Sequence, residues 1–392
     1  MDQRVTVETG LERFLREGAG RLRGRRVGLV TNHSAVDRNL DHAIDLLRAA
    51  GSIELATLFG PEHGVRGSAQ AGEEVGSAVD ASTGLPAYSL YGETLRPTPR
   101  MLQGLDCLVY DIQNYGVRYE TYPSTLLESM RAAAEAQLSF VVLDRPNPLG
   151  GHTVQGNVLQ PGYESFVGVF PLAVRHGLTV GELATMMNDR LGLGLDLTVV
   201  AMRGWRRAMW YDQTGLPWMP LSPNMPTLST VTLYPGTCLL EGTNLSEGRG
   251  TTVPFEVVGA PWLQAEALVR QLRAAGLEGA GFRATSFVPV FSKHAGQLCQ
   301  GVQIHILDRD RLDATALGVH LLVALRDLHA DRFEWRLRHE DSGCFSVDLL
   351  AGTSRLREMI DQGVPAAQIV ESWRAELQSF EHERAAYLLY ES

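Results

Sequence analysis

The sequence has little of what marks several common classes of protein. Basic residues are fewer than acidic ones, 35 against 45, and the formal net charge is −10 with no basic block. Nucleic acid is therefore not an expected partner, because neutralising phosphates needs a surplus of lysine and arginine. The cysteines form no Cys-x-x-Cys pair, so neither a zinc ribbon nor a thioredoxin-type site is supported. We expect buried thiols at Cys107, Cys238, Cys299 and Cys344.

Several cofactor and nucleophile motifs are also absent. No Gly-x-Gly-x-x-Gly follows the first predicted strand, and no loop ends in the Gly-Lys-Ser/Thr of a Walker A motif, so we expect no cofactor. A Gly-x-Ser-x-Gly nucleophile elbow is missing as well. His33, His63 and Asp111 could together bind a metal ion, but no His-Glu-x-x-His or His-x-Glu spacing supports it, and we predict no metal site.

Signals for a membrane are lacking too. No apolar run is long enough to span a bilayer, so we expect no membrane span. The N-terminus, residues 1–8, has no basic segment followed by an apolar one. For the sequence as given we expect a cytoplasmic protein, and the alternative is an exported protein whose signal the given sequence does not include. The oligomeric state stays open.

The first 150 of the 392 residues alternate between short β runs and helical patterns. Alternation of this kind predicts a parallel sheet covered by helices on both faces. The β runs lie at 26–31, 53–59, 105–112 and 138–143, and the helical patterns at 41–50 and 123–136.

A loop-rich stretch follows, and beyond residue 261 the pattern changes. The loop-rich stretch contains a helical pattern at 180–191 and a β run at 195–202. Two strands and several helices in no strict alternation then predict a second, α+β domain. We expect domains over residues 1–260 and 261–392. The later β runs lie at 302–307 and 345–350, and the helical patterns at 263–275, 314–329, 354–363 and 365–380.

Polar residues follow each of the first four predicted strands. Ligands of open parallel sheets bind outside the carboxyl ends of the strands, so these residues predict one binding crevice. They lie in the stretches 32–34, 60–64, 111–120 and 144–147.

Each crevice residue also has a structural alternative. Glu62 could cap a helix, and His63 could bond a backbone carbonyl. Asp111 could pair with Arg118 or Arg145. The remaining alternatives are an exposed ion pair for Glu120, a turn for Glu93, and a surface loop for Lys293 and His294.

Longer motifs resemble a known family. They are G-P-E-H-G-V-R-G, S-L-Y-G-E-T, D-I-Q-N-Y-G-V-R-Y-E-T-Y, L-D-R-P-N-P-L-G-G, L-S-P-N-M-P, E-G-T-N-L-S-E-G-R-G-T-T, F-S-K-H-A-G-Q-L-C-Q-G-V-Q-I-H and D-L-L-A-G-T. Together they are similar to the bacterial exo-β-N-acetylmuramidases of the NamZ type, formerly called YbbC, over nearly the whole chain.

The resemblance implies a Rossmann-like N-terminal domain, a smaller C-terminal domain and an active-site cleft between them. It also implies a glycoside hydrolase that releases terminal N-acetylmuramic acid from the non-reducing end of peptidoglycan fragments. The alternative of another class is a non-catalytic protein that binds a muropeptide or sugar in the same cleft.

Glycosidic hydrolysis needs an acid at the leaving oxygen and a base or nucleophile at the anomeric carbon. Glu62 is our candidate for the acid, and Glu120, Glu93 and Asp111 are candidates for its partner. Assistance from the 2-acetamido group of the sugar is a further route, and the sequence leaves these possibilities open.

The other candidate residues would bind substrate. The lactyl carboxylate of muramic acid suits the guanidinium of Arg118, Arg145 or Arg249. Sugar hydroxyls and the acetamido group suit Asn147, Asn224 and Asn244. We also expect contacts from Asn32, His63 and Tyr119 in the crevice, and from Lys293 and His294 in a loop that closes over the cleft from the C-terminal domain.

Overall fold

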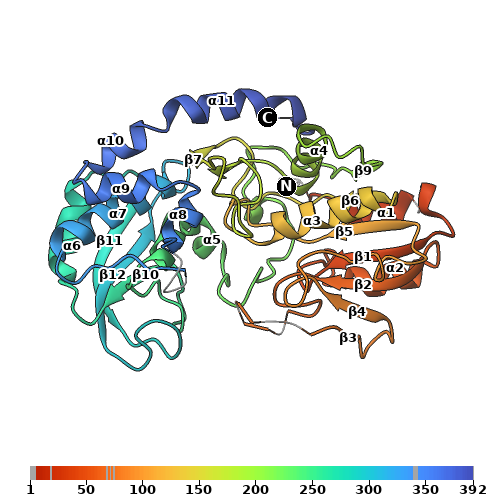
Figure 1. The fold of residues 1–392 in the computed structure, drawn as a ribbon, viewed down its shortest axis with the longest axis horizontal. Helices are drawn as coiled ribbons and strands as arrows, with labels where there is room; N and C mark the ends of the chain where they lie inside the picture. Colours follow the sequence, from red (N-terminus) through yellow and green to blue (C-terminus); the bar gives the residue numbers. More distant parts are fainter. Residues whose placement is uncertain are drawn as a thin grey trace, which may run out of the picture.

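In the computed structural model, residues 6–17, 20–67, 69–70, 72–73, 76–338 and 343–391 are described. A seven-stranded sheet with the order β3-β4-β2-β1-β5-β6-β9 forms the N-terminal half (Figure 1). All its neighbours pair in parallel except β3 and β4. The strands are β1 (Arg26–Thr31), β2 (Glu54–Gly60), β3 (Ala78–Val79), β4 (Pro86–Ser89), β5 (Cys107–Asp111), β6 (Ser139–Leu143) and β9 (Leu197–Val200).

Helices cover both faces of this sheet. Val27 and Leu29 of β1 pack in one apolar cluster with α1 (Gly10–Glu17) and α2 (Ala43–Ala50), whereas Val30 packs in another with α3 (Tyr122–Glu135) and α4 (Val180–Arg190). Strands covered on both faces are buried throughout, which is why they read as continuous apolar runs. The prediction of a Rossmann-like parallel sheet is therefore confirmed.

The C-terminal half contains a three-stranded antiparallel sheet with the order β10-β12-β11. Its strands are β10 (Val257–Ala260), β11 (Ala280–Phe287) and β12 (Cys299–Ile306), and its first helices are α5 (Leu228–Thr237), α6 (Ala265–Ala274) and α7 (Ala314–Leu328). Where α5 crosses α7, a Cβ on Gly236 would lie 1.8 Å from the carbonyl oxygen of Ala314. Only glycine permits this crossing, which joins α5 to the C-terminal half.

The predicted domain limit at residue 260 falls inside this second unit. The strand β10 ends at Ala260 and pairs with β12, and α5 packs against α7. Residues 228–260 therefore pack with C-terminal elements. The small sheet of β7 (Gln155–Val158) and β8 (Ala173–Arg175) precedes residue 228 in the chain, yet its strand β7 also contacts C-terminal elements. These are α7 and the last α-helix, α11 (Arg374–Arg384).

Two predicted elements near the C-terminus differ from the structure. The strand predicted at 345–350 is wrong, because these residues form the helix α8 (Ser346–Ala351). Val347, Leu350 and Ala351 are all buried, a spacing of three and four that suits a helix, and short apolar runs do not distinguish the two structures. The single helix predicted at 365–380 is divided into α10 (Ala366–Glu371) and α11 (Arg374–Arg384), after α9 (Arg355–Asp361).

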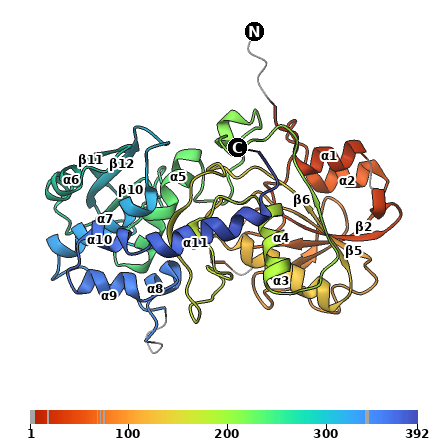
Figure 2. The ribbon, with the colours of Figure 1, turned by 90° about the horizontal axis from the view of Figure 1, so that it is seen from above.

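Helix α11 leads the chain from the C-terminal half back to the N-terminal half, and ends beside α4 (Figures 1 and 2). Its last residue, Arg384, is buried and donates from Nη1 to the carbonyl oxygens of Gly151 and Gly177, each at 3.0 Å. Nη2 donates to the carbonyl oxygen of His152 at 2.9 Å. Within the described ranges, no helix is both long and apolar enough to cross a membrane.

We expect Arg384→Met to lower the free energy of unfolding by about 3 kcal/mol, since several buried carbonyls lose a charged donor. Urea denaturation would measure the loss. The matched control is Arg374→Ala on the same helix, because Arg374 is exposed and, within the described ranges, its side chain bonds Glu371 alone, at 2.5 Å. An equal loss in both variants would contradict a joining role for Arg384.

Candidate active site

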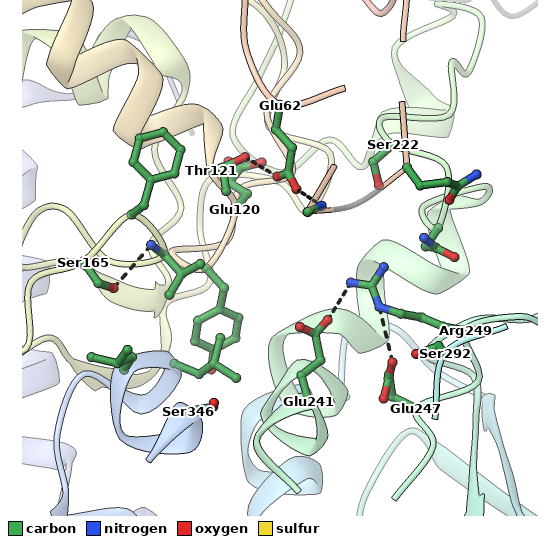
Figure 3. Close-up of a pocket in the computed structure, with 18 of the residues that line it drawn as sticks. Glu62, Glu120, Thr121, Ser165, Ser222, Glu241, Glu247, Arg249, Ser292 and Ser346 are labelled. Atoms are coloured by element: carbon green, nitrogen blue, oxygen red, sulfur yellow. Dashed lines mark hydrogen bonds and ion pairs between the residues drawn. The ribbon is translucent and has the colours of Figure 1, made fainter. Parts of the chain in front are cut away.

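A cavity of about 870 Å³ lies between the two halves. Its N-terminal wall comes from the segments that follow β2, β4 and β5, at the carboxyl ends of the parallel strands. Its C-terminal wall comes from residues after α5, from the loop between β11 and β12, and from the start of α8. Figure 3 shows Glu62, Glu120 and Thr121 on one wall, and Glu241, Glu247 and Arg249 on another.

Glu62 is held by hydrogen-bond donors on both carboxylate oxygens. Oε1 accepts from the backbone N–H of Gly72 at 2.8 Å, and Oε2 accepts from the hydroxyl of Thr121 at 2.8 Å (Figure 3). Thr121 immediately precedes α3, yet its hydroxyl makes no capping bond to that helix. Glu62 therefore lies near a helix N-terminus, where negative charge is favoured.

Tyr91 contacts the same carboxylate from the segment after β4. Burial, together with the charge of Glu62 and a hydrogen bond to it, raises the pKa of Tyr91 to about 12. The phenol thus stays protonated at neutral pH and can donate. Tyr91 belongs to the motif that suggested Glu93, but Glu93 is exposed and does not line the cavity. The motif therefore contributes its tyrosine to the site, and not its glutamate.

Glu120 lies on the same wall in a very different environment. It is 3% exposed, and burial raises its pKa well above the ordinary value, although N–H groups of Tyr115 and Gly116 oppose the shift. The Tyr115 N–H lies 2.5 Å from Oε2, whereas Oε1 is buried and has no hydrogen-bond partner among the described residues. Such an unsatisfied atom in a cavity wall is typical of a functional group.

The C-terminal wall carries a group of paired charges. Arg249 lies 2.7 Å from a carboxylate oxygen of Glu241 and 3.3 Å from one of Glu247. Lys293 lies 2.8 Å from the other oxygen of Glu247 and donates to the carbonyl oxygens of Leu240 and Thr243. Burial would lower the pKa of Arg249, but the two carboxylates raise it overall. Both cations are thus already neutralised by protein carboxylates.

Backbone strain occurs at both walls. His63 and Ser292 line the cavity with positive φ angles of 73° and 70°. Non-glycine residues in this region are costly and cluster at functional sites. The ring Nδ1 of His63 lies 2.9 Å from the carbonyl oxygen of Ala69. His294, with φ of 58°, bonds the carbonyl of Asn244 and does not itself line the cavity.

Asp111 and Arg145 lie away from the cavity. They form a fully buried ion pair, with Nε 2.5 Å from Oδ1 and Nη2 3.0 Å from Oδ2. Arg145 also donates to the carbonyl oxygen of Val36 at 3.0 Å. Neither charge is available to a substrate, so a structural role replaces the site roles predicted for both.

Arg118 is also structural. It donates to the carbonyl oxygens of Asn157 and Leu172 at 2.8 Å, and to those of Leu350 and Ala351 in α8 at 2.9 Å. Burial lowers its pKa to about 10. The guanidinium thus joins the two halves, and it does not reach the cavity.

Three predicted asparagines likewise hold the backbone. Asn32 accepts from Ser34, Asn147 donates to the carbonyl of Leu178, and Asn244 donates to that of Arg332. None lines the cavity. The predicted residues that do line it are Glu62, His63, Tyr119, Glu120, Asn224, Arg249 and Lys293.

Several lining residues were not predicted. Some lie inside the motifs already quoted, as neighbours of the residues chosen there. Arg336 and Arg338 belong to no quoted motif and carried no signal. The unpredicted polar lining residues include Tyr91, Tyr115, Thr121, Ser222, Tyr234, Glu241, Glu247, Ser292, Arg336 and Arg338. Across the described ranges, no three His, Cys, Asp or Glu side chains gather as a metal site would require.

Known proteins share this architecture. Two family models match, described as the N-terminal part of the exo-β-N-acetylmuramidase NamZ over residues 27–229 and its C-terminal part over residues 232–390. The chain belongs to the NamZ family. The peptidoglycan β-N-acetylmuramidase NamZ of Bacillus subtilis strain 168 is 46% identical over 384 residues, which cover 98% of this chain and 91% of that protein. The resemblance found in the motifs is confirmed.

Solved structures agree with the family assignment. A DUF1343 family protein of Bacteroides fragilis NCTC 9343 is 40% identical with a TM-score of 0.91, over 99% of this chain and 100% of that one. A second from the same organism is 31% identical with a TM-score of 0.78, over 98% and 99%. The two-domain α/β fold is therefore that of NamZ-family proteins.

We expect Asp111→Asn to cost about 3–5 kcal/mol of stability, because it leaves the guanidinium of Arg145 buried and unpaired. Urea unfolding measures the cost, with Asp45→Asn on the exposed side of α2 as control. The kcat of the folded variant should stay within a few-fold of the parent. If the Asp111→Asn protein is as stable as the parent but has little activity, Asp111 has a catalytic role and not a structural one.

Proposed function

We propose that this protein is an exo-β-N-acetylmuramidase that releases terminal N-acetylmuramic acid from the non-reducing end of peptidoglycan fragments. The observation that carries the proposal is the pair of cavity carboxylates, Glu62 and Glu120, in contrasting environments. Carboxyl groups whose surroundings separate their protonation states suit the acid and base roles of a glycosidase. Family membership supports the same activity.

We assign the proton donor to Glu120. Burial raises the pKa of its carboxyl well above the ordinary value, and this favours the protonated form that an acid at the leaving oxygen requires. Both carboxylate oxygens of Glu62 accept hydrogen bonds, one from the N–H of Gly72 and one from the hydroxyl of Thr121, so its environment contrasts with that of Glu120. Glu62 is then the carboxylate that acts at the anomeric centre. This reverses the acid role expected for Glu62 from the sequence.

Asn224 is suited to orient the sugar. It is 5% exposed and lines the cavity, and its Nδ2 has no hydrogen-bond partner among the described residues. A buried amide N–H without a partner is costly, and a substrate carbonyl or hydroxyl would satisfy it. The acetamido oxygen of N-acetylmuramic acid supplies such an acceptor.

Glu62→Gln should keep the fold and lose about two or more decades of kcat, the usual scale for carboxylate catalysis. Release of chromophore from a nitrophenyl N-acetylmuramide measures the loss. Glu93→Gln is the matched control, since Glu93 is exposed and outside the cavity. A parent protein that binds the muramide without releasing chromophore would instead be the non-catalytic binder.

Substrates whose leaving groups differ in acidity distinguish the roles of Glu62 and Glu120. An acid variant is rescued by an aryl leaving group that departs without a proton, whereas a variant lacking the group at the anomeric centre is not. Glu120→Gln should therefore approach the parent on a dinitrophenyl muramide and fall far below it on a disaccharide. If Glu62→Gln is the variant that is rescued, the two roles are exchanged.

The raised pKa of Glu120 also makes stability depend on pH. A carboxyl whose folded pKa exceeds its unfolded value stabilises the fold at low pH, and that contribution is lost as pH rises towards the folded pKa. Above the ordinary value of 4.5, the parent should lose stability that Glu120→Gln retains. Urea unfolding at pH 5 and pH 8, with Glu93→Gln as control, measures the difference. A constant difference between parent and variant would exclude a raised pKa.

A further inference from the structure

Among the described residues, four arginine and lysine side chains line the cavity, and they fall into two groups. Arg249 and Lys293 are paired with Glu241 and Glu247, as described above. Arg336 and Arg338 also line the cavity, but neither guanidinium has a hydrogen bond or ion pair within the described part of the chain. They are therefore the cavity cations that no described protein carboxylate neutralises.

The backbone holds these two arginines in a defined arrangement. Residues 335–338 form an extended segment between two others, with antiparallel bridges from Trp335 to Thr243 and from Leu337 to Phe345. The N–H of Arg336 donates to the carbonyl oxygen of Gly242 at 2.8 Å, and the N–H of Ser346 donates to that of Arg336 at 2.9 Å. Residues i and i+2 of an extended segment lie on one face, and Arg336 and Arg338 both line the cavity.

Other cationic candidates are occupied. The guanidinium groups of Arg118 and Arg145 are buried away from the cavity, and that of Arg249 already bonds protein carboxylates. Near Glu241 and Glu247, an anionic substrate group would be repelled by the two carboxylates. The neighbouring cations, Arg249 and Lys293, already pair with these carboxylates. The uncompensated positive charge of the described wall lies at Arg336 and Arg338, at the exposed mouth of the cavity.

We propose that Arg336 and Arg338 together bind the 3-O-lactyl carboxylate of the terminal muramic acid. Guanidinium groups match carboxylates in planar, charge-assisted geometry, and two on one face allow one oxygen each. This assignment rests on the proposed muramidase function and adds its specificity. N-acetylglucosamine lacks the lactyl group, so it leaves both arginines unpaired and binds without their contribution.

The test compares two sugars in the parent, in Arg336→Ala, in Arg338→Ala and in the double variant. With the nitrophenyl muramide, each single variant should raise KM about tenfold or more, the scale of one charge-assisted hydrogen bond, with kcat nearly unchanged. With the nitrophenyl glucosaminide, KM should not change. The parent's KM for the muramide should also rise with added NaCl, because exposed charges are screened.

Two further measurements exclude a general effect of lost charge and an effect on catalysis. Arg374→Ala removes an equal charge on the distant helix α11 and should leave both KM values unchanged. Calorimetric binding of free N-acetylmuramic acid to Glu62→Gln, with and without the arginine substitutions, gives affinity without turnover.

The possible outcomes are distinct. Tenfold weaker binding of N-acetylmuramic acid, with N-acetylglucosamine binding unaffected, would support the proposal. Unchanged muramic acid binding in the double variant would overturn the arginine assignment and leave the proposed activity standing. Equal loss for both sugars would also overturn it, because the arginines would then act on the cavity as a whole. A parent without turnover of either sugar would refute the proposed function itself.

Discussion

The guanidinium of Arg118 connects the two halves of the protein whose residues form the cavity walls. It is 1% exposed and bonds backbone carbonyls of the N-terminal half and of α8 in the C-terminal half. Because its pKa falls only to about 10, it keeps its charge at neutral pH and strengthens all four bonds. Arg384 makes the equivalent connection at the opposite end of the chain. The site depends on these joints, since neither half alone encloses it.

Within that frame, the contrast between Glu62 and Glu120 comes from backbone geometry. Glu62 follows β2 and accepts hydrogen bonds from two separate segments, whereas Glu120 bonds the N–H of Tyr115 in its own turn and is desolvated there. The turn needs Gly116 at φ of 83°, where a Cβ would lie 2.2 Å from the side chain of Asn147. Asn147, which we expected to bind sugar, thus helps to shape the turn that buries Glu120.

The sequence predicts the parallel sheet well and the C-terminal half less well, for a physical reason. Strands such as β1 and β6 are buried on both faces, so their apolar runs are unambiguous. A six-residue amphipathic segment such as α8 fits a strand and a helix equally, and only its packing decides. The strand ends locate the crevice only in part, because residues from 60–64 and 111–120 line the cavity, whereas none from 32–34 or 144–147 does. A strand end does not show which of its polar side chains enters the cavity. In the motif after β4, the sequence suggested Glu93, but the side chain that lines the cavity is Tyr91.

Arginine shows most clearly why the candidate site needed the structure. The same side chain bonds carbonyls at Arg118, pairs with a buried carboxylate at Arg145, and joins a charge cluster at Arg249. The quoted motifs contain all three of these arginines. Arg336 and Arg338, which pair with no carboxylate among the described residues, stand outside every quoted motif. Whether an arginine can bind a ligand depends on whether protein groups already occupy its guanidinium. The folded structure shows this, and the sequence does not.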